Sequence, residues 1–322
     1  MTYDTEAKAT GPAQFGLYQP QFRTDVTTMR ALARTAEDSG YDSFWLMDHL
    51  LTPGAPPCDT LESWTLLTAL ATATSTIRLG HLVGCNPLRP PALLAKMAAT
   101  VDQISDGRLD LGLGWGSVDE ELTRFGLGTS SRRQRAEQLG ETLEILEAMW
   151  TGRPFDHVGR HFTLRGAYGL PVPVQGRIPV HLGGAGRQLT MPLVARYADW
   201  WNCVGSARHR LEELAPLRGS ARISAQYAVG LAATRAEREP VAEATSRRLP
   251  EWAWGRALTG TPDELVARFL EERARGVELF IVRFHDFGRP ETVELFAREV
   301  AAVVRGVRAA DGLREPQPRQ GT

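Results

Sequence analysis

Lysine is almost absent from this chain of 322 residues, because Lys8 and Lys96 are the only lysines among 37 basic residues. A Schiff-base enzyme needs a buried lysine amine, and Lys96 falls in a predicted helix rather than at a strand end. The 37 basic and 38 acidic residues leave a formal charge of −1, and no basic stripe marks a nucleic-acid surface. The sequence therefore argues against amine catalysis and against a nucleic-acid partner.

Cysteine is also scarce. Cys58, Cys85 and Cys203 are far apart and form no C-x-x-C pair, which argues against a disulfide framework and a structural zinc site. No apolar run approaches the roughly 18 residues needed to cross a bilayer. The polar N-terminus, with Asp4 and Glu6, does not resemble a secretory signal. We therefore expect a cytoplasmic protein with no membrane partner.

Short apolar or β-rich runs alternate with longer stretches of helical periodicity. The predicted strands are 15–21, 44–50, 77–84, 108–114, 178–184, 200–204, a segment within 223–234, and 279–284. The predicted helices are 25–40, 61–74, 90–105, 132–150, 188–198, 209–217, 261–275 and 290–304. This alternation is typical of a parallel sheet with crossover helices.

A closed α/β barrel, the (β/α)₈ TIM barrel, needs about 250 residues and tolerates insertions. The excess length falls in the Gly-, Pro- and aromatic-rich segment 152–176, interpreted as an inserted hairpin or long loop, and in a long linker over 235–258. The sequence thus predicts one barrel domain over 14–304, with polar termini at 1–13 and 305–322.

The competing architecture is an open doubly wound sheet. Its usual G-x-G-x-x-G motif after the first strand is missing, since Gln19, Pro20 and Gln21 stand there instead. A single barrel is therefore the better interpretation.

In such a barrel the active site lies at the C-terminal ends of the strands. The polar and glycine residues at those ends are Gln19, Gln21, Asp48, His49, 84–86, 112–117, 183–187, Asn202, His285 and Asp286. His49 can exchange a proton near neutral pH or donate a hydrogen bond to a bound ring. Because neighbouring residues of a strand face opposite ways, Asp48 should not share that role. The alternative is a polar pair that caps the following loop.

The glycine-rich segment 183–187 separates a predicted strand from a helix. Its backbone can approach an anion closely, and Arg187 can add a charged fork, so the segment is a candidate phosphate site. A plain tight turn is the alternative, and segment 112–117 allows the same two interpretations.

Metal binding is the rival use of strand-end histidines. His49, His81, His181 and His285 lie on or near strands, but no H-x-H pair or carboxylate cluster accompanies them. We therefore expect no metal site. His157, His161 and His209 are expected at the surface. The tryptophans either line an aromatic pocket or belong to the core.

Several longer stretches carry a family resemblance. They are 41–50 (YDSFWLMDHL), 61–67, 77–80, 89–102, 105–114, 178–184, 196–199 and 260–263. These stretches occur in the right order along the sequence, and through them the chain resembles the luciferase-like monooxygenase superfamily and, within it, the coenzyme F420-dependent oxidoreductases. The resemblance covers residues 15 to 304 and implies a bacterial-luciferase-like (β/α)₈ barrel with one insertion. It also implies a flavin or deazaflavin in the C-terminal mouth.

The resemblance further implies roles for individual residues. A non-proline cis peptide between Leu82 and Val83 would press against the ring, and His49, preceded by Asp48, would stand at the reactive carbon as the catalytic pair. The implied cofactor-binding residues are Leu82, Val83, Asn86, Gly114, Trp115, Gly116, Ser117, Gly183, Gly184, Ala185, Gly186 and Arg187. The substrate-pocket candidates are Gln19, Trp64, Trp200 and Trp201.

Two positions depart from the family pattern. Relatives commonly read Gly-x-Gly-Trp after the fourth strand, whereas here Trp115 precedes Gly116 and Ser117, and relatives often have glycine where this chain has Trp200. Both departures lie where substrate would meet cofactor, so a relative's substrate does not transfer to this chain.

The resemblance favours hydride transfer between coenzyme F420 and a small organic substrate. The first alternative is a monooxygenase that uses reduced flavin mononucleotide (FMN) and oxygen. A remote alternative is a cofactor-free binding barrel. The implied partners are a flavin or F420 reductase and a second copy of the chain in a homodimer.

Overall fold

Eight parallel strands close into a barrel in the computed structural model, which describes residues 11–128 and 130–306. The strands are β1 (Gln14–Tyr18), β2 (Ser43–Leu46), β3 (Arg78–His81), β5 (Leu109–Gly114), β8 (Val180–Gly183), β9 (Trp200–Cys203), β10 (Arg222–Leu231) and β12 (Leu279–Phe284). They pair in chain order, and β10 pairs with both β9 and β12, which closes the ring. The predicted (β/α)₈ barrel is confirmed. The predicted polar termini are 1–13 and 305–322, and most of their residues lie outside the described part of the chain.

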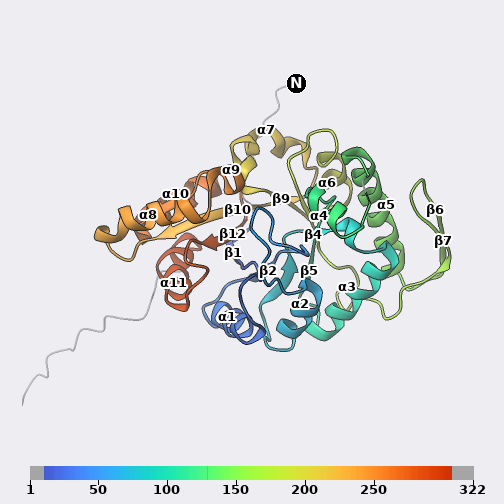
Figure 1. Cartoon of the computed structure of the whole chain (residues 1–322), viewed down its shortest axis with the longest axis horizontal. Coiled ribbons are helices and arrows are strands. Elements are labelled where there is room, and N and C mark those ends of the chain that lie inside the picture. The colour runs from blue at the N-terminus through green and yellow to red at the C-terminus, as the bar shows by residue number, and fades with distance from the viewer. Residues whose placement is uncertain (1–10, 129, 307–322) are drawn as a thin grey trace, which may run out of the picture.

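Helices follow the strands and surround the barrel (Figure 1). They are α1 (Val26–Asp38), α2 (Ser63–Ala71), α3 (Pro91–Ser105), α5 (Arg132–Trp150), α6 (Met191–Tyr197), α7 (Leu211–Leu214), α10 (Pro262–Ala274), α11 (Pro290–Phe296) and α12 (Ala302–Val304). Capping side chains determine where several helices begin. The Asp25 side chain accepts the Thr28 N–H at 2.8 Å, and Ser131 and Thr261 each form a capping box.

Two predicted helices are shorter than expected. The helix predicted over 188–198 begins only at Met191, because 187–190 form a turn in which the Thr190 N–H donates to the Gly186 carbonyl. The helix predicted over 209–217 is reduced to α7 between two 3₁₀ turns, Gly205–Arg210 and Ala215–Leu217.

The segment 152–176 is a β-hairpin of β6 (Phe155–Val158) and β7 (Thr163–Ala167). It lies at the opposite end of the molecule from α8 (Arg238–Arg248) and α10 (Figure 1). Glu141 of α5 holds the turn, since its carboxylate accepts the backbone N–H groups of Arg160, His161 and Phe162. His157 and His161, expected at the surface, are partly exposed on this hairpin and lie against Glu141 and Glu137.

The expected linker over 235–258 is instead structured. It contains α8 and α9 (Glu251–Trp254) and leads into β11 (Leu258–Gly260), which pairs with the extended end of β10. Only Thr245 of α8 is buried, so the helix has almost no apolar face for periodicity to reveal.

The barrel interior is filled by a cluster of Tyr18, Trp45, Met47, Leu82, Trp200, Leu279 and Ile281, separate from the larger core between strands and helices. Trp200 and Leu279 begin their strands and lie at the floor, whereas Leu82 follows β3 and lies at the mouth. Gly16 and Gly80 make room for Trp45, because a Cβ on either residue would lie 2.6 Å from the indole. The packed floor leaves the C-terminal mouth as the place for a ligand. Among the described residues, no helix is long and apolar enough to span a membrane.

Candidate active site

A cavity of about 330 Å³ opens in the mouth of the barrel. It is lined by His49, Leu82, Val83, Gly84, Cys85, Gly114, Trp115, Gly116, Ser117, Gly183, Gly184, Val204 and Gln226. The structure thus brings together His49, the Leu82–Val83 segment and both predicted glycine-rich strand ends. The cavity volume is within the range of small-molecule binding sites.

Val83 projects between two glycines. The Leu82–Val83 peptide is cis, as predicted, and β4 (Gly84–Cys85) follows it and pairs with β5. A Cβ on Gly114 or on Gly183 would lie 2.8 Å from a Val83 methyl group. Both positions must therefore be glycine for Val83 to sit where it does.

His49 is paired with a carboxylate that sequence analysis missed. Its Nδ1 lies 2.8 Å from Oε2 of Glu121, on the short helix α4 (Asp119–Arg124), and the Leu50 N–H donates to Oε1 at 2.6 Å. Glu121 is fully buried, whereas the His49 side chain is 24% exposed. Since a carboxylate only accepts, Nδ1 carries the proton and Nε2 is left as the acceptor.

Asp48 has partners of its own, separate from those of His49, although both residues lie beyond the end of β2 at Leu46 rather than in the strand predicted over 44–50. Its carboxylate accepts hydrogen bonds from Ser63 Oγ at 2.5 Å, from the Cys85 N–H at 2.9 Å and from both terminal nitrogens of Arg89 at 2.7 and 3.0 Å. Burial acts to raise the pKa of Asp48. The nearby charges of His81 and Arg89, with these hydrogen bonds, outweigh burial and hold the pKa below its usual value. Asp48 therefore anchors β4 rather than lining the cavity, which corrects its expected catalytic position.

The segment 183–187 is only partly a ligand surface. Gly183 and Gly184 line the cavity, and the Trp201 indole N–H holds the Gly184 carbonyl at 2.8 Å. Arg187 is 62% exposed and lies 3.6 Å from Glu213. A phosphate here would meet glycine backbone and Arg187 rather than a helix N-terminus, because α6 begins further along.

Ala185 and Gly186 continue this loop beyond the cavity, and Arg210 donates to the Ala185 carbonyl at 3.1 Å. Asn86 is buried in a 3₁₀ turn behind β4, and its Oδ1 has no hydrogen-bond partner among the described residues. These predicted cofactor residues border the mouth without lining its cavity.

The predicted substrate residues do not meet in the mouth. Trp200 begins β9 on the barrel floor, where its ring stacks on His181 at 5.4 Å. Trp201 packs outside the barrel, and Trp64 lies on α2 with its ring 4.6 Å from that of His81. Gln19 borders a separate groove beside α1. These four residues therefore do not form one pocket in the mouth, because adjacent strand residues face opposite sides and Trp200 lies at the N-terminal end of its strand.

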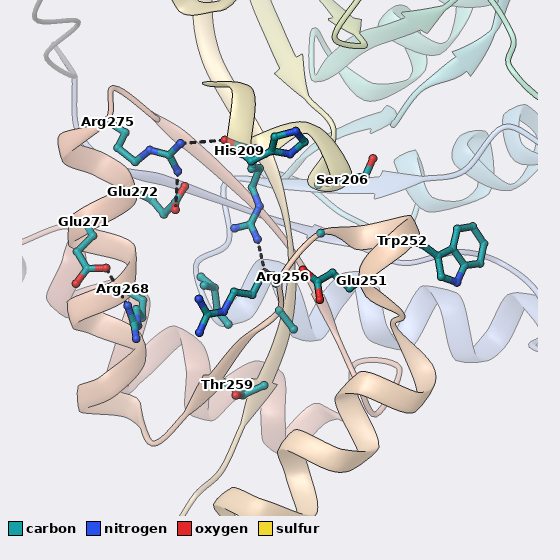
Figure 2. A pocket seen from close by; sticks show the side chains of 15 residues that line it. Ser206, His209, Glu251, Trp252, Arg256, Thr259, Arg268, Glu271, Glu272 and Arg275 are labelled. Atoms are coloured by element: carbon teal, nitrogen blue, oxygen red, sulfur yellow. Dashed lines mark hydrogen bonds and ion pairs between the residues drawn. The ribbon is translucent and has the colours of Figure 1, made fainter. Parts of the chain in front are cut away.

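A larger cavity, about 720 Å³, lies outside the barrel between the Gly205–Arg210 turn and α10. Its charged side chains largely pair with one another, with Arg268 3.3 Å from Glu271 and Arg275 3.0 Å from Glu272 (Figure 2). The exposed His209 lines it. Neither His49 nor Val83 borders this cavity, so the candidate site is the mouth. Within the described ranges, no three His, Cys, Asp or Glu side chains form a candidate metal cluster.

Comparison with known proteins identifies the family. The model of the luciferase-like monooxygenase family matches residues 7–277, so the chain belongs to that family. A Mycobacterium tuberculosis protein described as uncharacterized is 34% identical over 190 residues, which are 54% of this chain and 66% of that protein. Pyrimidine monooxygenase RutA of Methylobacterium radiotolerans is 32% identical over 204 residues, which are 62% of this chain and 52% of RutA. The chain therefore matches only part of these relatives.

A solved structure shares the fold. An F420-dependent secondary alcohol dehydrogenase, in complex with an F420-acetone adduct, superposes with a TM-score of 0.77 over 92% of this chain and 100% of that one. The two sequences are 18% identical, so this likeness shows the fold alone.

Proposed function

We propose that this member of the luciferase-like monooxygenase family transfers a hydride between coenzyme F420 and a small organic substrate in the barrel mouth. The observation that carries the proposal is the pair of His49 and Glu121, 2.8 Å apart, at the edge of the cavity that Val83 enters. A bound deazaflavin supplies the hydride chemistry, which these side chains do not provide themselves.

The residues of the mouth fit a flat ring. Val83 offers an apolar surface, and Gly114 and Gly183 beside it present backbone where any Cβ would collide. Trp115 to Ser117 would hold one edge of the ring. Arg187, from the 183–187 loop, would meet the phosphate of the cofactor side chain.

His49 handles the proton in this proposal. Interconversion of an alcohol and a carbonyl moves a proton at the substrate oxygen as well as a hydride at carbon. His49 Nε2 is the acceptor left for that proton, and Glu121 stabilises the imidazolium through Nδ1–H. Glu121 also fixes the orientation of the ring, because its other oxygen is held by the Leu50 N–H.

Other residues hold this arrangement in place. Asp48 binds Arg89 and the Cys85 N–H, and so ties the end of β2 to β4 directly after Val83. Trp201 fixes the Gly184 carbonyl beside the cavity. These contacts lock His49, Val83 and the glycines relative to one another, which catalysis by orientation requires.

A second candidate keeps the fold and changes the chemistry. RutA, a monooxygenase by name, is 32% identical over the matched region, and this similarity favours a reaction of reduced FMN and oxygen with a small organic molecule. His49 would then serve as the base toward the substrate. A flavin reductase would be the partner of this version, whereas an F420 reductase would serve the first, and either version fits a homodimer.

Binding experiments separate these proposals. The full chain is titrated with F420 and with FMN while tryptophan fluorescence is followed, since Trp115 lines the cavity. We expect saturable quenching with F420 at lower concentration than with FMN. Tight binding of FMN alone, with oxygen consumption when FMN is reduced, would overturn the F420 version. If neither F420 nor FMN binds, and a His49→Ala variant behaves like wild type, the result would support a cofactor-free barrel.

A further inference from the structure

Arg283 is a cation inside the barrel for which the described residues provide no hydrogen-bond or ion-pair partner. It lies on β12 at an inward position, two residues beyond Ile281 and four beyond Leu279, both of which belong to the interior cluster. Within residues 11–128 and 130–306, its guanidinium forms no hydrogen bond or ion pair, and its Nε is buried without a partner. The residue as a whole is partly exposed, and neither terminal nitrogen is among the buried atoms that lack a partner, so these donors remain open to an anion.

The surroundings of Arg283 are aromatic rather than acidic. Its Cζ lies 4.6 Å from the ring centroid of Trp254 and 6.0 Å from that of Phe22. The ring of Tyr18 lies 5.7 Å from that of Trp254. Burial lowers the pKa of Arg283 to about 10, which still leaves the side chain charged at neutral pH.

Arg283 is not among the residues that line the mouth cavity, but the strand register places it near that cavity. On the neighbouring strand β10, Ala228 pairs with Arg283 and Gln226 pairs with Ile281. Gln226 lines the mouth cavity, so Arg283 stands one inward position further toward the C-terminal opening. Trp254 and Val83 pack against the same interior cluster. The cation therefore lies near the cavity, on the side of Gln226 that faces the C-terminal opening.

The contact with Trp254 is a cation–π contact, and no side-chain or backbone acceptor of the described residues takes a hydrogen bond from the Arg283 guanidinium. A planar group with two acceptor oxygens matches the edge of a guanidinium through two parallel hydrogen bonds.

We propose that Arg283 binds a carboxylate group of the substrate, so that the enzyme acts on small organic anions. This inference rests on the proposed function, because it assumes that the mouth is the reaction site. Trp254 belongs to α9, in the 235–258 segment, and that segment therefore supplies part of the substrate subsite. The phosphate of the cofactor is the other source of an anion, and the experiment distinguishes the two.

The experiment uses benzoate and benzamide, two probes of the same shape that differ in charge. Isothermal titration calorimetry measures their Kd with the full chain, with and without saturating F420. We expect wild type to bind benzoate at least about tenfold more tightly than benzamide, from a charge-assisted bidentate hydrogen bond. Arg283→Met should abolish this preference, and Arg283→Lys should retain a smaller one. The affinity for F420 should stay unchanged in both variants.

Arg248→Met is the matched control. Arg248 is exposed on α8 and lies over Phe287 at 5.7 Å, so it also places a cation beside an aromatic ring but outside the barrel. This variant should keep the preference for benzoate. Melting temperatures followed by circular dichroism show whether each variant is folded.

Four results decide between the inference and its alternatives. Equal binding of the two probes by wild type, or an unchanged preference in Arg283→Met, would refute it. Loss of F420 binding in Arg283→Met with the benzoate preference retained would assign the residue to the cofactor phosphate and also refute it. A preference that depends on Arg283 in a protein that binds no F420 would support the anion subsite and reject the proposed function.

Discussion

Glu121→Gln tests the proton-handling pair without changing its shape. In wild type, Oε1 of Glu121 accepts the Leu50 N–H at 2.6 Å and Oε2 lies 2.8 Å from His49 Nδ1. A glutamine must keep its single oxygen on Leu50, because otherwise two N–H groups would face each other in a buried site. Its NH₂ group then meets Nδ1, which becomes the acceptor, and the proton of the neutral ring moves to Nε2.

The consequence is a His49 that offers a donor where the reaction needs an acceptor. General acid–base catalysis contributes about 10²–10⁴-fold to a rate, so we expect kcat to fall by about 100-fold or more. The substrate KM and the affinity for F420 should change little, because Glu121 does not line the cavity.

The assay is anaerobic reduction of bound F420 by the best substrate found, followed by the visible absorption of the oxidised deazaflavin. NMR of the His49 ring nitrogens reports the tautomer directly. Glu120→Gln is the matched control, since Glu120 lies on the same helix but is exposed and paired with Arg124. Turnover of Glu121→Gln within about threefold of wild type, with an inverted tautomer, would refute the reasoning.

Three further outcomes are expected. Gly183→Ala should lower the free energy of unfolding, measured in urea, by about 1–3 kcal/mol and should weaken F420 binding. The reason is that the new Cβ would lie 2.8 Å from a Val83 methyl group, so adding Val83→Ala in the same chain should restore the stability. Asp48→Asn should cost about 3 kcal/mol at pH 7, since it breaks a buried ion pair. The pKa of Asp48 is lowered in the folded state, so the ionised carboxylate stabilises the fold above the unfolded pKa of about 3.9. The difference in melting temperature between Asp48→Asn and wild type should therefore shrink as the pH falls below that value. Burial raises the pKa of Cys85 to about 12, so iodoacetamide at pH 8 should label the half-buried Cys58 first; faster labelling of Cys85, read by mass spectrometry, would contradict this.

The barrel could be predicted because its signals are local. Each strand is a short apolar run, most helices have a regular apolar face, and turn glycines and capping residues mark the boundaries. The segment over 235–258 lacked such signals. Helix α8 buries only Thr245 and is stabilised by its contact with the extended end of β10, which sequence periodicity does not reveal.

The candidate site could be predicted only in part. The different positions of His49 and Asp48 could be predicted although both lie beyond β2, and strand ends identified Val83 and its glycines. Glu121 was missed because it belongs to an acidic run, 119–121, that is typical of an exposed face, and its six-residue helix is too short to show periodicity. Arg283 was missed because an arginine within an apolar strand gives no sign of whether it has a partner. The roles of Glu121 and Arg283 depend on contacts between segments that are far apart in the sequence.

The most direct measurement is a crystal structure of the chain soaked with F420. We expect electron density for the ring in the mouth of the barrel, in van der Waals contact with Val83 and with one edge beside His49. Density in the charged cavity outside the barrel, or a ring in the mouth that contacts neither residue, would contradict it.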